Sequence, residues 1–296
     1  MDRRRIKAAL MGLDPERLRA AWLSRQIQRL PCGEFASSNG RLPLRPGLRR
    51  VILGNRRPAT ARPSAPADQV KLLEGVLERH RIDPDSRIVE IGCHEGRLLD
   101  HLARRGFRDL RGVDFAPYHG SDLTEGRSQE GVAIDWRGFE DADIQGCELI
   151  FSFDTFEHLA EWRLFLRRAW EGLAPGGMLY VHYNAFAGIN GAHSPGTVDV
   201  PWGHVFLKEE EHLRLVREQD PACAGENERF VVRDLNRVDL ASVNRELAAL
   251  EARGSVLAAA SAGDRLLFRR LFEGFEAPYV REELFVRQVE IFLHRS

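Results

Sequence analysis

Residues 89–106 read VEIGCHEGRLLDHLARRG, and this stretch decides the fold class. An apolar strand ends near the acid Glu90, a loop bounded by Gly92 and Gly96 follows, and an amphipathic helix comes next. Glycine lets backbone approach a ligand closely, and the free N–H groups at a helix start favour an anionic group. The stretch therefore predicts the first strand, the cofactor loop and the first crossover helix of an α/β sheet.

The chain on either side of this loop alternates short apolar strands with helices. We expect strands at 87–91, 110–114, 131–135, 148–153, 178–183 and 285–293, and helices from Asp68 and at 96–105, 158–172, 208–219, 239–252 and 264–272. This alternation predicts an α/β fold, with a doubly wound, mostly parallel sheet and helices on both faces.

The remaining segments suggest the domain organisation. We expect residues 1–67 to form an N-terminal basic arm or lid, helical from Asp14 and irregular beyond, and residues 68–296 to form the main domain. Within that domain, 184–207 lack periodicity and are expected to be an active-site loop, and 236–280 are expected to be a helical insertion. Residues 1–66 carry 15 Lys+Arg against 4 Asp+Glu, although the whole chain has a net charge of −1.

Bulk composition places the chain among ordinary globular proteins. It is 43% hydrophobic and 29% charged, and its four cysteines form no C-x-x-C pair. No stretch approaches the roughly 18 apolar residues of a membrane-spanning helix, and the N-terminus lacks the apolar core of a secretory signal. We therefore expect a cytoplasmic protein that makes no membrane contact.

Acids recur at the ends of successive strands. Glu90 ends the first strand, Asp114 ends the second in RGVDF, and Asp135 ends the third in VAIDW. The fourth strand reads CELIFSFDTFEHL, and LAPGGMLYV leads into the fifth. Over about 68–184 this series resembles class I S-adenosylmethionine-dependent methyltransferases, although His94 replaces the middle glycine of their E/D-x-G-x-G-x-G loop.

The resemblance implies a Rossmann-like, seven-stranded sheet, a cofactor, S-adenosyl-L-methionine, and a role for each acid. Asp114 would accept hydrogen bonds from the ribose, Asp135 would bind the adenine amino group, and Glu90 would position the loop or the cofactor's ammonium group. The expected cofactor-binding residues are Glu90, Gly92, Cys93, His94, Gly96, Asp114, Phe115, Asp135, Trp136 and Phe153, the last near the sulfonium. Alternative interpretations are that Glu90 caps its own loop, that Trp136 belongs to the core, and that Cys93 is a packed small residue.

Side chains that could take a proton from a methyl acceptor follow strands four and five, where ligands bind in open α/β sheets. The predicted catalytic residues are His158, His204 and His182. Other candidates nearby are Asp154, Glu157, Tyr183, Asn184, His193 and Asp199. A structural role for His158 is an equal alternative.

A divalent metal is a second hypothesis for this region. Asp154 or Glu157, together with His158 and His204, resembles the metal-binding set of some catechol-type and small-RNA 2′-O-methyltransferases. Carboxylate and imidazole ligands suit such ions, which lower the pKa of a bound hydroxyl. Because the E-H-L motif also occurs without metal, a bound metal is possible but not favoured.

The sequence thus predicts methyl transfer to an oxygen or nitrogen of a small-molecule acceptor, in bacterial secondary or sugar metabolism. Three alternatives remain open: an RNA or protein acceptor held by the basic arm, a non-catalytic binding module of the same fold, and a dehydrogenase. No RNA-binding signature accompanies the arm, which makes nucleic acid the less favoured partner. The G-x-G-x-x-G loop of dehydrogenases is absent. The oligomeric state stays open.

Overall fold

The computed structural model describes residues 67–115, 132–189, 191–193, 201–219, 221, 223–250, 253–260, 264–265, 268 and 279–295. The predictions for 1–66, for Asp199 and for most of the helix at 264–272 lie outside these residues. Within the described part, no helix is long and apolar enough to cross a membrane.

The chain divides into two compact units. The sheet unit comprises Pro58–Tyr183, Ala241–Ala258 and Val289–Ser296, and the second unit comprises Met1–Arg57, Asn184–Leu240 and Ala259–Gln288.

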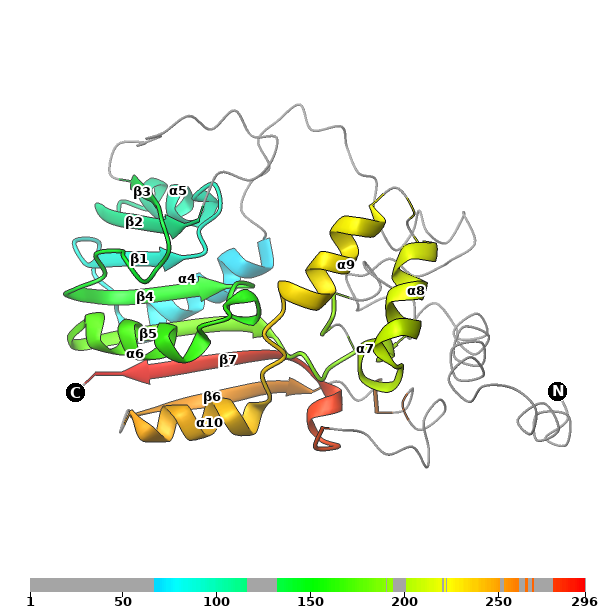
Figure 1. The fold of residues 1–296 in the computed structure, drawn as a ribbon. Coiled ribbons are helices and arrows are strands. Elements are labelled where there is room, and N and C mark those ends of the chain that lie inside the picture. Colours follow the sequence, from blue (N-terminus) through cyan, green and yellow to red (C-terminus); the bar gives the residue numbers. More distant parts are fainter. Residues whose placement is uncertain are drawn as a thin grey trace, which may run out of the picture. The chain divides into compact units, whose positions relative to one another are not determined.

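A seven-stranded sheet organises the sheet unit. Its strands are β1 (Arg87–Ile91), β2 (Asp109–Asp114), β3 (Val132–Trp136), β4 (Cys147–Phe153), β5 (Leu173–Asn184), β6 (Arg253–Ala260) and β7 (Val286–His294), in the spatial order β3-β2-β1-β4-β5-β7-β6 (Figure 1). Strands β3, β2, β1, β4 and β5 pair in parallel. The predicted fold class is confirmed.

Strand β7 runs against β5. The amide of Gly176 donates to the carbonyl of Arg295 at 2.8 Å, and the amide of Ala185 donates to the carbonyl of Arg287 at 3.1 Å. Residue numbers therefore rise along β5 as they fall along β7, which makes the two strands antiparallel. Strand β5 begins earlier than the predicted 178–183. Its register with β4 shifts between Cys147 and Leu149, because the Pro175–Gly177 turn is accommodated as an irregularity within the strand.

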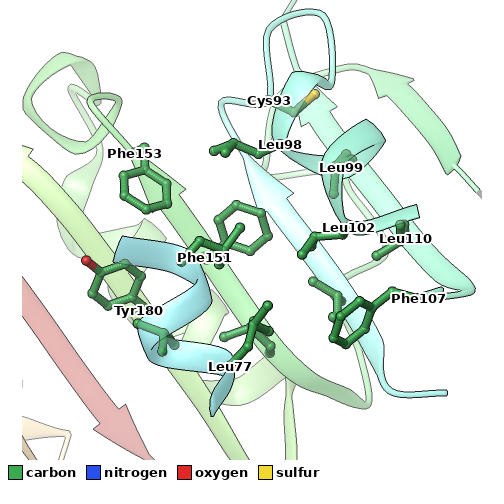
Figure 2. Close-up of a cluster of buried hydrophobic side chains, with 14 of the residues drawn as sticks. Leu77, Cys93, Leu98, Leu99, Leu102, Phe107, Leu110, Phe151, Phe153 and Tyr180 are labelled. Atoms are coloured by element: carbon green, nitrogen blue, oxygen red, sulfur yellow. The ribbon is translucent and has the colours of Figure 1, made fainter. Parts of the chain in front are cut away.

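Apolar side chains cover both faces of the sheet. On one face α4 (Ala67–His80) and α5 (Arg97–Arg104) contribute Leu73, Leu77, Leu98 and Leu102 to a single cluster with residues of β1, β4 and β5. Figure 2 shows part of this cluster, in which Phe151, Phe153 and Tyr180 lie together across β4 and β5. The other face is covered by α6 (Trp162–Gly172) and α10 (Leu240–Ala249) (Figure 1).

Strand β6 corrects one prediction. Residues 236–280 were expected to be a helical insertion, and α10 lies there, but Arg253–Ala260 form a strand. The run LAAA favours a helix locally. Pairing with β7 overrides that preference, and Gly254 permits it, since a Cβ at this position would lie 2.0 Å from the carbonyl oxygen of Phe292.

Helices form most of the regular structure described in the second unit. They are α7 (Gly203–Phe206), α8 (Glu209–Gln219) and α9 (Ala224–Arg233), of which α8 was predicted and α9 was not. Residues 184–207 are not wholly irregular, because α7 lies within them. A 3-10 helix, η3 (Glu283–Phe285), leads into β7.

Candidate cofactor and active site

In the glycine loop between β1 and α5, three residues have the positive φ of left-handed backbone. Gly92, His94 and Gly96 have φ of 77°, 52° and 71°. The amide of Gly92 donates to the carbonyl of Val113 at 2.8 Å, which ties the loop to the end of β2. A Cβ on Gly92 would lie 2.0 Å from Thr155 Oγ1, so glycine is required here for conformation and for space.

Cys93 occupies the interior of this loop. Its side chain is 3% exposed, and burial raises the pKa of its thiol well above the ordinary value. Gly112 on β2 makes the space, because a Cβ there would lie 2.5 Å from the Cys93 sulfur. The thiol is thus a packed group, in agreement with the alternative interpretation of Cys93. Gly112 was missed by the sequence analysis, although it stands two residues before Asp114.

Glu90 is the most unusual residue of the site. It is 4% exposed at the end of β1, and its Oε2 atom has no hydrogen-bond partner among the described residues. Burial, and then the neighbouring charge of Asp114, raise the pKa of its carboxyl well above the ordinary value. A buried carboxylate without a partner is costly, so the free site favours the neutral acid.

Asp114 faces the same loop from the end of β2. Its Oδ2 atom accepts the amide of His94 at 2.7 Å, and its Oδ1 atom accepts the amide of Phe115 at 2.8 Å. These bonds hold the carboxylate at the rim of the loop, where its remaining lone pairs can accept further hydrogen bonds. The structure therefore brings Glu90, Asp114 and the glycine loop together, as predicted.

The other predicted cofactor residues surround this edge in different environments. Asp135 forms an ion pair with Arg137 at 3.1 Å, with both side chains partly exposed, and Trp136 is half-buried at the end of β3. Phe115 is 67% exposed, whereas Phe153 is 5% exposed within the core cluster. An exposed aromatic ring beside the loop can stack on a ligand, but the buried Phe153 ring already packs against Tyr180 at 5.5 Å.

His182 and Asp154 meet at the carboxyl ends of β5 and β4. His182 Nδ1 lies 3.5 Å from Asp154 Oδ1, and the amide of Asp154 donates to the His182 carbonyl at 2.9 Å. Asp154 has a φ of 48°, and its Oδ2 atom accepts from Gln69 of α4 at 2.9 Å. Gln69 was not anticipated, because only the fold brings α4 to residues 85 positions away.

His158 lies in a short 3-10 helix, η2 (Phe156–His158), rather than at the start of α6 as predicted. Its amide donates to the Thr155 carbonyl at 2.8 Å, and the adjacent Glu157 is 2% exposed. Glu157 and His158 belong to the sheet unit, and His204 belongs to the second unit. The metal set that combines them remains a prediction.

His204, in α7, is integrated into the second unit. Its Nε2 atom lies 2.7 Å from the carbonyl oxygen of Phe186, so Nε2 carries the proton in the neutral ring. Burial, and then the nearby His212, lower the pKa of His204 to about 3. Burial and Arg237 lower the pKa of His212 to about 4. These contacts are those of a neutral histidine pair, in which His212 is buried and His204 is partly buried, and a catalytic role for His204 remains a prediction.

Comparison with known proteins supports the fold and the loop. Residues 60–220 match the family described as "Methyltransferase domain", which is more than half of the chain. The chain belongs to the methyltransferase-domain family. The match spans the glycine loop, the three strand-end acids and η2. It confirms the resemblance to class I S-adenosylmethionine-dependent methyltransferases and, at the level of the family, the enzyme class and the cofactor.

Curated relatives are similar over a shorter part. A ubiquinone biosynthesis O-methyltransferase of Azorhizobium caulinodans is 37% identical over 99 residues, which are 32% of this chain and 39% of the relative. One of a Chelativorans species is 33% identical over 100 residues, again 39% of the relative. The chain thus matches about two fifths of the length of these relatives.

Solved structures give more distant likenesses. The plantazolicin methyltransferase BpumL in complex with SAH is 11% identical, with a TM-score of 0.47, over 98% of this chain and 94% of that one. A geranyl diphosphate methyltransferase in complex with SAM is 12% identical, with a TM-score of 0.47, over 77% and 85%.

Proposed function

We propose that this protein is an S-adenosylmethionine-dependent methyltransferase that methylates a hydroxyl group of a small molecule, with an amine nitrogen as the second type of acceptor. One observation supports this most strongly: a glycine loop held at positive φ stands between two strand-end acids, Glu90 and Asp114, in a chain of the methyltransferase-domain family.

The residues of the loop fit the cofactor by their chemistry. Asp114, held by the amides of His94 and Phe115, keeps lone pairs for the two ribose hydroxyls. The buried Glu90 oxygen, which has no hydrogen-bond partner in the described part of the chain, suits an ammonium group, and the first amides of α5 suit a carboxylate. Asp135 would accept the adenine amino group once its carboxylate turns from Arg137. The cofactor supplies an activated methyl group on a cationic sulfur.

The chain then has to align the acceptor and remove its proton. His182 is the base candidate whose setting is best defined, since Asp154 lies beside its Nδ1 atom and a carboxylate stabilises the imidazolium that forms. His158, at the end of η2, is the second candidate. Holding the acceptor in line with the methyl group and away from bulk water provides much of the rate enhancement in reactions of this type.

The curated relatives act on oxygen, which favours a hydroxyl acceptor over an amine. Their names refer to ubiquinone biosynthesis and give no support to secondary or sugar metabolism. The proposal is therefore restricted to a small hydroxylated molecule.

Calorimetric titration with S-adenosylhomocysteine tests the cofactor site. We expect Asp114→Ala and Asp135→Ala to lower the affinity, Asp114→Ala by about 10- to 100-fold, because hydrogen bonds to a charged group contribute about 1.5–3 kcal/mol each. Asp109→Ala is the matched control, since Asp109 begins the strand that Asp114 ends. Unchanged affinity in both variants, or no binding by the wild-type protein, would refute the proposed function.

Methyl transfer itself is measured as S-adenosylhomocysteine release with a panel of small phenols, catechols and amines. We expect turnover with hydroxylated members of the panel and loss of turnover in Asp114→Ala. If the protein binds the cofactor but acts only on RNA or protein, the small-molecule part of the proposal is wrong.

A further inference from the structure

Glu90 is a buried acid for which the described residues provide no counter-charge. The side chain is 4% exposed, and Oε2 has no hydrogen-bond partner among the residues that the structure describes. Moving a carboxylate out of water without a cation or hydrogen-bond donors carries a large free-energy penalty, which a protein avoids by keeping the group protonated.

The charge that faces Glu90 increases this tendency. Asp114 at the end of β2 contributes a like charge. The Cys93 thiol in the loop is kept neutral by burial and by the negative charges of the two acids, and so it provides no positive charge. In the register of the sheet, Glu90 stands opposite Gly112 of β2 and Phe151 of β4, which carry no charge. None of these neighbours offers Glu90 a positive charge.

Asp114 differs from Glu90 in this respect. Both of its oxygens already accept main-chain amides, at 2.7 Å from His94 and 2.8 Å from Phe115. Amide donors stabilise the charged form of a carboxylate. When only one of the two acids can be ionised, Glu90 therefore holds the proton and Asp114 keeps the negative charge.

We infer that Glu90 is a neutral acid in the unliganded protein and ionises when a ligand ammonium group docks beside it, so that binding releases a proton and selects ligands with a cationic amino-acid end. This inference rests on the proposed function, because it takes the ligand to be an S-adenosyl amino acid. The proton leaves the Glu90 carboxyl for solvent, the carboxylate and the ammonium form an ion pair, and no covalent bond of the ligand changes.

Two ligands separate the ammonium from the nucleoside. S-adenosylhomocysteine carries the amino-acid end, and 5′-methylthioadenosine has the same adenosine and thioether without it. An α-amino group titrates near 7.7–8.0, so the ligand ammonium keeps its proton between pH 5.5 and 6.5. Any proton released in that range comes from the protein.

The experiment is isothermal titration calorimetry of the full chain at pH 6.0, in buffers of low and high ionisation enthalpy such as Pipes and imidazole. The difference in observed binding enthalpy between the two buffers gives the number of protons released. For the wild-type protein we expect release of about one proton with S-adenosylhomocysteine, an affinity that rises up to about tenfold from pH 5.5 to 6.5, and no release with 5′-methylthioadenosine.

Two variants locate the proton. Glu90→Gln keeps the shape of the side chain and cannot ionise, so we expect no proton release and about 10- to 100-fold weaker binding of S-adenosylhomocysteine, with 5′-methylthioadenosine unaffected. Glu95→Gln is the control, because Glu95 lies in the same loop but pairs with Arg97 at 3.0 Å in a partly exposed position. It should keep the proton release.

The outcomes separate this inference from the proposed function. Binding of S-adenosylhomocysteine without proton release, or with a release that persists in Glu90→Gln, overturns the role of Glu90 and leaves the methyltransferase proposal standing. Failure of the wild-type protein to bind either ligand overturns both. The buffer comparison on the wild-type protein needs no variant, so a poorly folding variant would not obscure the result.

Discussion

Glu90 and Asp264 are both deeply buried carboxylic acids, and they differ in what lies beside them. Asp264, in the second unit, is 1% exposed, and its two oxygens accept from Arg287 Nε at 2.6 Å and Nη2 at 2.5 Å. Glu90, in the sheet unit, is 4% exposed and has an oxygen without a partner among the described residues. Asp264 has its cation within the part of the chain that the structure describes, and Glu90 has none there.

The difference separates a structural acid from a binding acid. A bidentate arginine satisfies the geometry and charge of Asp264, and removal of either partner leaves an uncompensated charge. The environment of Glu90 is incomplete without a ligand, as expected of a group whose counter-charge arrives with a substrate or cofactor. The predictions below test this contrast, from the largest expected effect to the smallest.

Breaking the Asp264–Arg287 pair should have the largest effect. We expect Asp264→Asn to lower the free energy of unfolding by about 3–5 kcal/mol, because Arg287 then keeps a buried charge without a partner. Urea denaturation measures this effect. The double variant Asp264→Leu/Arg287→Met, which removes both charges, should recover most of the loss. A loss below 1 kcal/mol in the single variant would contradict the structural role.

Gly92 tests whether the loop beside Glu90 tolerates any side chain. A Cβ here meets Thr155 Oγ1 at 2.0 Å, and φ is 77°. We expect Gly92→Ala to lower the free energy of unfolding by about 2–4 kcal/mol, from left-handed strain and overpacking together, and to weaken S-adenosylhomocysteine binding. Gly106→Ala is the control, since Gly106 has a φ of 95° with nothing within 4 Å of a new Cβ. Equal losses in the two variants would show that the contact with Thr155 does not matter.

The paired histidines of the second unit, His204 and His212, predict a loss of stability in mild acid. The pKa of His204 is lowered to about 3 and that of His212 to about 4, both below the ordinary value of 6.5. Above pH 6.5 both histidines are neutral in the folded and the unfolded state, and the full stability is present. As the pH falls from 6.5 toward 4, the unfolded state binds protons that the folded state does not, and stability is lost. Each histidine contributes up to about 1.4 kcal/mol per pH unit.

Denaturation at pH 6.5 and 5.0 measures this slope. His212→Gln should remove about half of it, whereas replacement of the exposed His94 should leave it unchanged. A free energy of unfolding that does not change between pH 6.5 and 5.0 would show that folding does not lower the pKa values of the two imidazoles.

Glu90→Gln should have the smallest effect on stability and the opposite sign to Asp264→Asn. Burial and Asp114 raise the pKa of Glu90, so its contribution to stability is present below the unfolded value of 4.5 and is lost as the pH rises through the folded value. The variant should therefore gain in thermal midpoint relative to the wild-type protein between pH 5 and pH 8. A Glu90→Gln protein that loses stability at pH 8 would show that the charged form is already satisfied.

Most of the sheet could be predicted because its signals are local. Strand β1, the glycine loop and α5 follow from contiguous residues, and so do β2, β3 and β4 within one or two residues. Strand β6 could not be predicted, because its alanine-rich sequence has no strand period and its pairing with β7 depends on residues at least 26 positions away, from Ala260 to Val286. Helix α9 was likewise missed.

The candidate site divides in the same way. Residue type and spacing assigned Glu90, Asp114 and Asp135 to the ends of neighbouring strands, and the structure places them there. Three other features of the site could be seen only in the folded structure. They are the contact of Thr155 with Gly92, the space that Gly112 leaves for Cys93, and the hydrogen bond from Gln69 to Asp154.

The sequence by itself therefore determined the order of the sheet elements and the positions of the acids, because hydrophobic period and turn chemistry act over a few residues. Only the tertiary structure decided which buried acid has a cation among the described residues and which has none there. Arg287 lies 23 positions after Asp264 in the sequence. Glu90 lies opposite Gly112 and Phe151, which are also distant from it along the chain. Charge compensation depends on distances in space, and these are fixed only when the chain is packed.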